Sequence, residues 1–244
     1  MNKQGLLLCA KYSVAPNYFG YCGPDENKTL VDHLKEGVAD KEVELILSEF
    51  ETLYLNLTLI AKENKIDDVF DKQVVEAYWL GNKLLQNVLS RDYTHLLDEK
   101  FKLEKKLGVK KLSKLTYKIN SQKIFPHHSF HVFNIFKRTG HDPSFHTLTT
   151  MDECRIGWGQ VMEVKKNKII VSTNPLTVIG NRLCFGSPIK KELHLEYKGK
   201  KFLSFLKKKD WVSFHWSYVC DVIETQKMNN LFYYTSKAID FYNS

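Results

Sequence analysis

Apolar residues recur every three or four positions through the first 150 residues, which is the spacing that places them on one face of a helix. Shorter helices of this kind are expected at 4–13, 29–36, 92–106 and 110–120, and the aromatic segment after Pro126 predicts one more. The two clearest stripes run through 41–61 and 73–88, and their members are Val43, Ile46, Leu47, Phe50, Leu53, Leu57 and Ile60, then Val74, Tyr78, Gly81, Leu85 and Val88.

The pattern changes after the segment KRTGHDPS (137–144), which is rich in loop-forming residues. IGWGQVMEV (156–164), the turn KKNK and KIIVST (168–173) together predict a β-hairpin. Further strands are expected in RLCFG, ELHLEY and WVSFHWSYVCDVI, and a last helix begins near Thr225, a plausible N-cap. We therefore expect an α+β chain, with an all-helical domain at 1–150 and a small β-barrel with a C-terminal helix at 151–244.

Composition narrows the class of protein. With 244 residues, of which 43% are hydrophobic, the chain is able to bury a sizeable core. No apolar run approaches the roughly 20 residues of a membrane span, and GLLLCA (5–10) is too short for a signal peptide. Five widely spaced cysteines without a CxxC pair argue against a disulfide framework. These features predict a soluble, cytoplasmic protein with reduced thiols.

The net charge of +8 raises the question of nucleic-acid binding, but only four of the 36 basic residues are arginines. Arginine supplies the forked hydrogen bonds that base and phosphate recognition uses. The lysines gather in 100–118, at positions typical of the wet face of a helical pair. We interpret this stretch as a solvated face or a docking patch for an acidic protein. A nucleic-acid-binding protein remains a weaker alternative.

Cys154 stands directly in front of the first predicted strand, where alanine or valine would satisfy packing. Two segments around it, CRIGWGQVMEV (154–164) and KKDWVSFHWSYVCDVIETQKMNNL (208–231), resemble the HypC-like family of hydrogenase-assembly chaperones. The resemblance implies a small β-barrel that helps to deliver iron, with its cyanide and carbonyl ligands, to the large subunit of nickel–iron hydrogenases. It places Cys154 and His215 at the family's essential cysteine and strand histidine. The N-terminal half, at 6–27, resembles an uncharacterised prokaryotic family.

Ligand chemistry agrees with this pair of residues. Low-spin iron(II) that bears cyanide and carbonyl is a soft centre, which thiolate and imidazole suit. Cys154 and His215 are 61 positions apart and meet only if the first and last strands of the barrel are neighbours. The alternative is that both side chains serve packing alone, as a small buried thiol and a hydrogen-bonded core histidine.

Other cysteines and histidines offer further candidates. His127, His128 and His131 lie within five residues, and on a helix His127 and His131 would share a face, as metal ligands often do. They are candidate additional ligands, or partners of the ligands, or else buried structural histidines. Cys22, between Tyr21 and Gly23, is a possible accessible thiol that His128 would activate as a base. Cys9, Cys184 and Cys220 are expected to serve packing, the last two inside the barrel.

The leading hypothesis from the sequence is an accessory protein for nickel–iron hydrogenase maturation, which carries an iron–cyanide–carbonyl unit or docks on the assembly machinery. Its partner would be a hydrogenase large subunit or another maturation factor, with neither membrane nor nucleic acid involved. The alternative from another class is a thiol- or metal-dependent enzyme that uses Cys22 and the histidines at 127–131. An assembly factor is preferred over an enzyme.

Overall fold

The computed structural model describes residues 2–24, 29–99, 104–105, 108–135, 147–197, 199–203 and 205–244. The first half of the described chain is helical, and the strands all follow residue 156. The helices are α1 (Lys3–Tyr18), α2 (Leu30–Glu36), α3 (Lys41–Ser48), α4 (Glu51–Glu63), α5 (Lys72–Trp79), η1 (Lys83–Asn87), α6 (Ser90–Glu99), α8 (Val109–Gln122), α9 (His128–Phe130), η2 (His131–Ile135), α10 (Leu148–Cys154) and α11 (Thr225–Asn243).

Both long apolar stripes are divided between two elements. The stripe at 41–61 becomes α3 and α4, and the stripe at 73–88 becomes α5 followed by the 3-10 helix η1. The second division falls at Gly81, whose φ of +86° belongs to the left-handed region that favours glycine. A Cβ at this position would stand 2.1 Å from a ring carbon of Tyr234, so Gly81 also lets α11 approach closely.

Five strands form a sheet that closes on itself. β1 pairs with β2 on one side and with β6 on the other, β2 continues to β5, and β6 pairs with β7. A parallel pairing of His194 with Tyr218 joins β5 to β7 and completes the closed barrel. The strands are β1 (Gly157–Val164), β2 (Lys168–Thr173), β5 (Ile189–His194), β6 (Trp211–His215) and β7 (Tyr218–Ile223). The chain is therefore a mixed α+β protein, as its sequence predicts.

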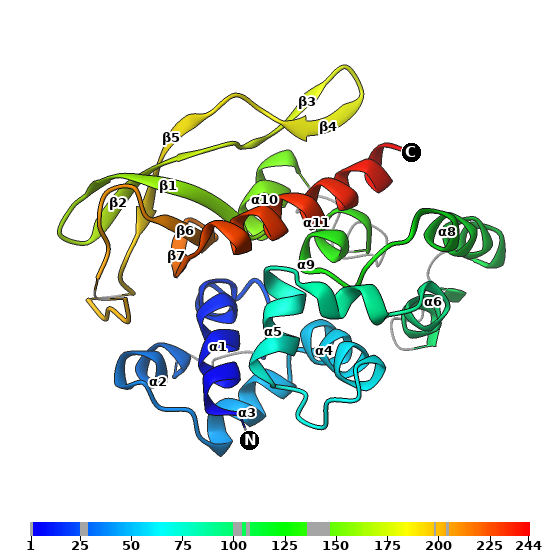
Figure 1. Cartoon of the computed structure of the whole chain (residues 1–244), viewed down its shortest axis with the longest axis horizontal. Coiled ribbons are helices and arrows are strands. Elements are labelled where there is room, and N and C mark those ends of the chain that lie inside the picture. The colour runs from blue at the N-terminus through cyan, green and yellow to red at the C-terminus, as the bar shows by residue number, and fades with distance from the viewer. Residues whose placement is uncertain are drawn as a thin grey trace.

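A separate two-stranded sheet, β3 (Leu176–Ile179) and β4 (Arg182–Phe185), lies outside the barrel and leans over α11 (Figure 1). The prediction that Cys184 lies inside the barrel is therefore wrong, because Cys184 belongs to β4 and is half-buried. The same prediction fails for Cys220 on β7. Side chains alternate between the two faces of β7. Val219 therefore points into the barrel interior, whereas Cys220 lies in the core that the barrel shares with the helices.

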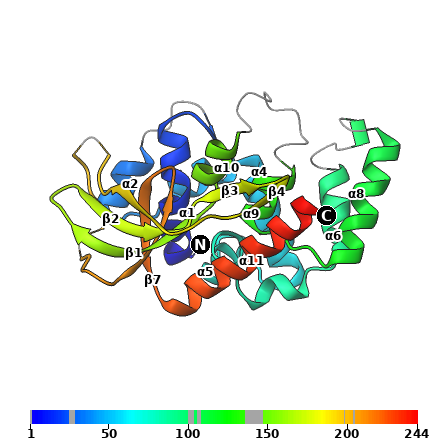
Figure 2. The ribbon, with the colours of Figure 1, turned by 90° about the horizontal axis from the view of Figure 1, so that it is seen from above.

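That shared core runs across residue 150. It contains side chains from α1 through α11 together with residues on the outer face of the barrel, whereas the barrel interior is a smaller cluster of its own. Figures 1 and 2 show that α11 starts beside β6 and β7 and runs away from the barrel, and it packs against β6 at the barrel and against α9 in the helical part. The proposed division into a helical domain at 1–150 and a barrel domain at 151–244 stays a prediction.

The basic stretch at 100–118 is described only in part. On α8 the buried side chains are Leu115 and Ile119, whereas Lys110, Lys111 and Lys114 are exposed, as expected of a solvated face. Within the ranges given above, no helix has both the length and the apolar character needed to cross a membrane. The predicted loop at 137–144 lies outside the described residues.

Candidate metal centre

Cys154 is the last residue of helix α10, and β1 begins three residues later at Gly157. The prediction that this cysteine directly precedes the first strand is therefore wrong in its local structure. Helix α10 begins at a capping box in which Thr147 and Thr150 exchange side-chain and main-chain hydrogen bonds. Cys154 thus sits on a short, capped helix that runs directly into the barrel.

The neighbour of Cys154, Glu153, fastens α10 to the turn between β6 and β7. Its main-chain carbonyl accepts a hydrogen bond of 2.9 Å from the amide of Trp216, and its carboxylate accepts one of 2.8 Å from the hydroxyl of Ser217. The same carboxylate pairs with Lys191 on β5. Because this turn directly follows His215, the two hydrogen bonds to the turn bring Cys154 and His215 together although they are far apart in the sequence.

The turn itself has an unfavourable backbone conformation. Trp216 and Ser217 have φ values of +50° and +63°, as a two-residue turn of type I′ requires. Asparagine and glycine are the usual residues there, since a left-handed conformation costs other residues roughly 1–2 kcal/mol. The hydrogen bonds to Glu153 hold the turn in place, so that strained backbone lies directly beside His215.

Three side chains from separate parts of the fold meet at this point. The ligand atoms of His128, Cys154 and His215 all lie within 4.8 Å of one another. His128 comes from α9, Cys154 from the end of α10 and His215 from the end of β6. Of the residues predicted from the sequence as ligands, the structure therefore brings these three together.

His215 points a bare ring nitrogen at this cluster. Its Nδ1 lies 2.7 Å from the main-chain carbonyl of Tyr12, and since a carbonyl only accepts, Nδ1 carries the proton. Nε2 then bears a lone pair, and it finds no hydrogen-bond donor among the described residues although His215 is only 1% exposed; the main-chain carbonyl of Cys154 is the other polar group near the ring. Burial lowers the pKa of His215 to about 4, so the ring is neutral at pH 7. A neutral imidazole oriented by a carbonyl is the form that binds metal ions.

His128 uses both ring nitrogens within the protein. Nε2 lies 2.9 Å from the carbonyl of Cys154, and Nδ1 lies 3.2 Å from the hydroxyl of Tyr78. Nε2–H therefore donates to the carbonyl, and Nδ1 accepts from the tyrosine. Burial, and then the neighbouring His215, lower the pKa of His128 well below its usual range. To bind a metal ion, His128 must exchange one of its two hydrogen bonds for a bond to the metal.

The thiol of Cys154 is protonated at neutral pH. Burial raises its pKa above its usual range, and a negative charge on Cys22, when that thiol ionises, raises it further. With both histidines neutral, no cation at the cluster opposes that rise. A bound metal ion would supply the missing positive charge, and a coordinating thiol loses its proton to such an ion.

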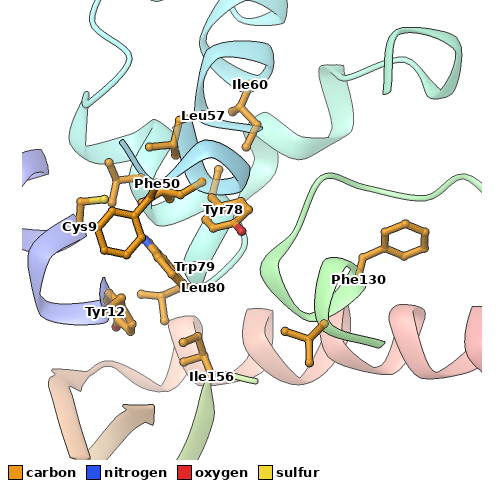
Figure 3. Close-up of a cluster of buried hydrophobic side chains, with 14 of the residues drawn as sticks. Cys9, Tyr12, Phe50, Leu57, Ile60, Tyr78, Trp79, Leu80, Phe130 and Ile156 are labelled. Carbon is orange, nitrogen blue, oxygen red and sulfur yellow. The ribbon is translucent and has the colours of Figure 1, made fainter. Parts of the chain in front are cut away.

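Aromatic rings from the helical layer form one wall of the site. Figure 3 shows Tyr12, Tyr78 and Trp79 among the buried apolar side chains of that layer. The ring of Trp79 lies 4.5 Å from His128 and 5.9 Å from His215, measured between centroids, and it stacks on Tyr12 at 5.6 Å. Tyr78 packs edge-on against Trp79 at 4.9 Å. The apolar wall keeps the histidines neutral and fixes their orientation.

The remaining predicted ligands lie elsewhere. His127 has an extended backbone (φ −106°, ψ 146°), caps α9 and stacks on the ring of Tyr234, while His131 begins the π-helical segment η2. They therefore do not share one face of a regular helix, and neither belongs to the cluster. Cys22 is exposed in the loop after α1 and also lies outside the three-residue cluster.

Sequence reasoning missed the residues that orient the ligands. Tyr78 appears in the second apolar stripe and was interpreted as core, and Tyr12 belongs to the first helix, about 200 residues from His215. Helix α10 was missed as well, although the spacing of Thr147 and Thr150 before an acidic turn is a recognisable helix start. The contact of α1 and α5 with the end of β6 is a tertiary relationship that no local pattern reveals.

The fold and the cluster define a mixed α+β protein with a closed five-stranded sheet and a buried Cys/His₂ group between the sheet and a helical layer. The whole chain, residues 1–244, matches the model of a family of unknown function, DUF6390, and the protein belongs to that family. No curated protein and no solved structure matches the chain.

The family match corrects one expectation from the sequence. The C-terminal part does not belong to the HypC-like family, because a single model of a different family covers the strands and the N-terminal helices together and no HypC family matches. The juxtaposition of Cys154 and His215 is independent of that assignment, since it is a property of the structure.

Proposed function

We propose that the protein binds one transition-metal ion through Cys154, His128 and His215 and acts as an accessory protein that holds this ion for another protein. The observation that carries the proposal is the convergence of three ligand atoms within 4.8 Å, one of them the bare Nε2 of a buried, carbonyl-oriented histidine. A lone pair buried without a partner costs free energy, and a metal ion would satisfy it.

The charge state of the cluster favours a metal site over a nucleophile. A cysteine nucleophile needs its thiolate stabilised by a nearby cation or base. Here burial raises the pKa of Cys154 and lowers the pKa of His215 to about 4, so the two groups rest as a neutral pair. The alternative base, His128, already has hydrogen bonds at both ring nitrogens. The cysteine-enzyme alternative therefore has no supporting arrangement in the described residues.

One thiolate and two imidazoles suit a borderline or soft divalent ion such as iron(II), cobalt(II) or zinc(II) rather than magnesium or calcium. Three protein ligands also leave a coordination position for a further ligand. Iron(II), as the iron–cyanide–carbonyl unit, is our proposed cargo, and the large subunit of a nickel–iron hydrogenase is the proposed recipient. A carrier needs such an incomplete set of ligands, since delivery requires release.

The first experiment separates metal binding from the fold. Metal-free protein, reduced and checked by circular dichroism, is titrated anaerobically with iron(II) and with cobalt(II) for wild type, Cys154→Ala and His215→Ala. We expect one ion per chain in wild type and at least about tenfold weaker binding in both variants. Cys184→Ala, which removes a thiol on the separate β3–β4 sheet, should bind as wild type does. Equal affinity in all four proteins would disprove the site.

The second experiment tests the recipient. The protein is purified from cells that make hydrogenase and examined by infrared spectroscopy for iron-bound cyanide and carbonyl, and its co-purifying proteins are identified. We expect these bands in wild type and in Cys184→Ala, and their loss in Cys154→Ala. Metal binding in the first experiment without these bands in the second would keep the metal site and remove the hydrogenase role.

A further inference from the structure

The turn between β1 and β2 and the chain that leads from β5 to β6 meet at one end of the barrel. Strand β1 begins three residues after Cys154 and runs away from the metal centre to this turn. Lys201 donates a hydrogen bond to the main-chain carbonyl of Lys166, which ties the two segments together. Figures 1 and 2 both show the turn at the outer edge of the molecule. We call this part of the fold, residues 165–168, 199–203 and 205–209, the lysine-rich end.

The lysine-rich end carries a large excess of positive charge. Eight lysines and three carboxylates occupy the described residues of 163–168 and 195–210. Two of these lysines, Lys168 and Lys200, form ion pairs with carboxylates of neighbouring elements. The others are exposed and form no ion pair with a described residue, and they are Lys165, Lys166, Lys201, Lys207, Lys208 and Lys209. Their charge is therefore free to attract an anionic partner.

An aromatic ring projects into solvent between these lysines. Phe205 is 94% exposed, more than any other large apolar side chain among the described residues. Its neighbours Leu203 and Leu206 pack against the cluster that fills the barrel interior. The segment is thus anchored to the barrel on both sides of Phe205, whose own ring gains nothing from the fold. Such exposure of a large apolar ring inside a charged patch is a feature of binding surfaces.

A hollow of about 350 Å³ lies at the same end, and Leu203 and Leu206 line it. The rest of its lining is aliphatic or basic, and consists of Val164, Leu195, Lys165, Lys166 and Lys201. Leu195 is buried, whereas the three lysines are exposed. The hollow therefore combines an apolar floor with a positively charged rim, which is complementary to a molecule with an apolar chain and an anionic head.

We propose that the lysine-rich end is a docking surface for an anionic lipid membrane. The lysines contact the headgroups, and Phe205 enters the boundary between headgroups and acyl chains. Attachment is to the surface only, since no helix of the described residues is able to span a membrane. The inference is independent of the metal centre, and it differs from the expectation from the sequence that no membrane is involved. The difference arises because the lysines and the exposed ring form one surface only in the fold.

The apolar side chains favour a lipid surface over nucleic acid, the other common polyanion. Proteins that bind single strands offer several aromatic rings on which successive bases stack. At the described lysine-rich end only Phe205 offers an exposed ring, because Phe202 stacks on Tyr197, at 5.9 Å between centroids. The remaining apolar groups are aliphatic, and the basic groups are all lysines, without the fork of arginine.

The test is co-sedimentation of the full-length protein with vesicles of phosphatidylcholine, with and without phosphatidylserine, at physiological ionic strength. We expect wild type to bind only the vesicles that contain phosphatidylserine. Phe205→Ser should bind them at least about tenfold more weakly, since it removes the inserted ring. Lys207→Gln combined with Lys208→Gln should weaken binding by at least about tenfold as well, through the loss of two charges.

Helix α8 provides matched controls, because it carries exposed lysines and an exposed ring on another surface. Tyr117→Ser, at a side chain that is 77% exposed, and Lys110→Gln combined with Lys111→Gln should bind vesicles as wild type does. All the substituted residues are exposed, so circular dichroism should show an unchanged fold in every variant.

Three results would overturn the proposal. The first is no binding, or equal binding to vesicles with and without phosphatidylserine. The second is a loss in the α8 variants as large as in the variants of the lysine-rich end, which would be an effect of net charge alone. The third is nanomolar binding of a single-stranded oligonucleotide that weakens in Phe205→Ser, which would assign the surface to nucleic acid instead.

Discussion

The ring Nδ1 of His215 donates a hydrogen bond of 2.7 Å to the main-chain carbonyl of Tyr12, across 203 residues of sequence. Tyr12 also bonds through its hydroxyl to Ser213, two residues before His215 on the same strand, at 2.8 Å. Helix α1 therefore holds the end of β6 at two points. The first fixes which nitrogen of His215 carries the proton, and so which nitrogen faces the centre.

Tyr78→Phe tests whether the partner of His128 supports metal binding. The substitution removes the hydroxyl that bonds to Nδ1 and keeps the buried ring. We expect cobalt(II) affinity to fall about 10–100-fold, as is usual when a partner of a metal ligand is removed, with a stability loss of only about 1 kcal/mol. Tyr117→Phe, at a tyrosine that is 77% exposed, is the control. Unchanged affinity in Tyr78→Phe would show that the hydroxyl does not support the ligand.

The metal-free protein should lose stability in mild acid. The pKa of His127 is lowered to about 3 and that of His215 to about 4, both by burial. Between these values and pH 6.5, only the unfolded chain takes up protons on these two histidines. The stability that the neutral, buried histidines contribute is therefore complete above pH 6.5 and is lost as pH falls. Each histidine contributes up to about 1.4 kcal/mol per pH unit in that range. Urea midpoints at pH 7.5, 6.5 and 5.5 measure the effect.

His127→Gln provides the control for this acid effect. It removes one buried histidine that is not a proposed ligand. The unfolding free energy should therefore fall less steeply with decreasing pH, by the contribution of one histidine, up to about 1.4 kcal/mol per pH unit. His95→Gln, whose side chain is 69% exposed, should leave the slope unchanged. A wild-type midpoint that is constant from pH 7.5 to 5.5 would contradict the neutral, buried state of these histidines.

Arg155 is the largest fully buried charged side chain among the described residues, and it fixes α10 to the β3–β4 sheet. It donates to Asp152 at 2.8 and 2.9 Å and to the carbonyl of Asn174 at 2.8 Å. Arg155→Met leaves the largely buried Asp152 without its cation, and we expect a loss of about 3–5 kcal/mol in unfolding free energy. Arg155→Met with Asp152→Asn should recover part of that loss. Equal stability of the single and double variants would show that the charge pair is not the cause.

The turn beside His215 permits a matched comparison at one position. Ser217→Ala and Ser217→Gly both remove the hydroxyl that bonds to Glu153. Only glycine accepts the φ of +63° without strain, so the glycine variant should be the more stable by about 1–2 kcal/mol. Denaturant unfolding of the two variants measures the difference. Equal stability would mean that the left-handed conformation at this position costs nothing.

Much of the architecture was predictable from local pattern. The hairpin of β1 and β2 and helix α11 follow from spacing and turn residues, and their predicted starts agree closely with the structure. The division of the long stripes was not predicted, because the break at Gly81 depends on the approach of Tyr234 from the far end of the chain. The β3 strand was missed since it is short and lies outside the barrel.

The candidate site was predictable in its residue types more than in its geometry. Cys154 was singled out by its position before a predicted strand, and His128 by its neighbours. His215 was paired with Cys154 through the resemblance to the HypC-like family, which the family match does not support. Their convergence depends on Glu153, which bonds to the turn after β6, and on α1, which orients the histidine. Such contacts join distant parts of the sequence, and a single sequence carries no local signal of them.

The core that crosses residue 150 has a consequence for how this family is able to vary. Side chains from α1 to α11 share one buried cluster with the outer face of the barrel, so neither half is free to be exchanged for an unrelated module without exposing apolar surface. Shuffling of halves between lineages would be selected against, and changes on one side of the boundary would favour compensating changes on the other. A family model that spans 1–244 as one unit is the pattern of inheritance that such a core produces.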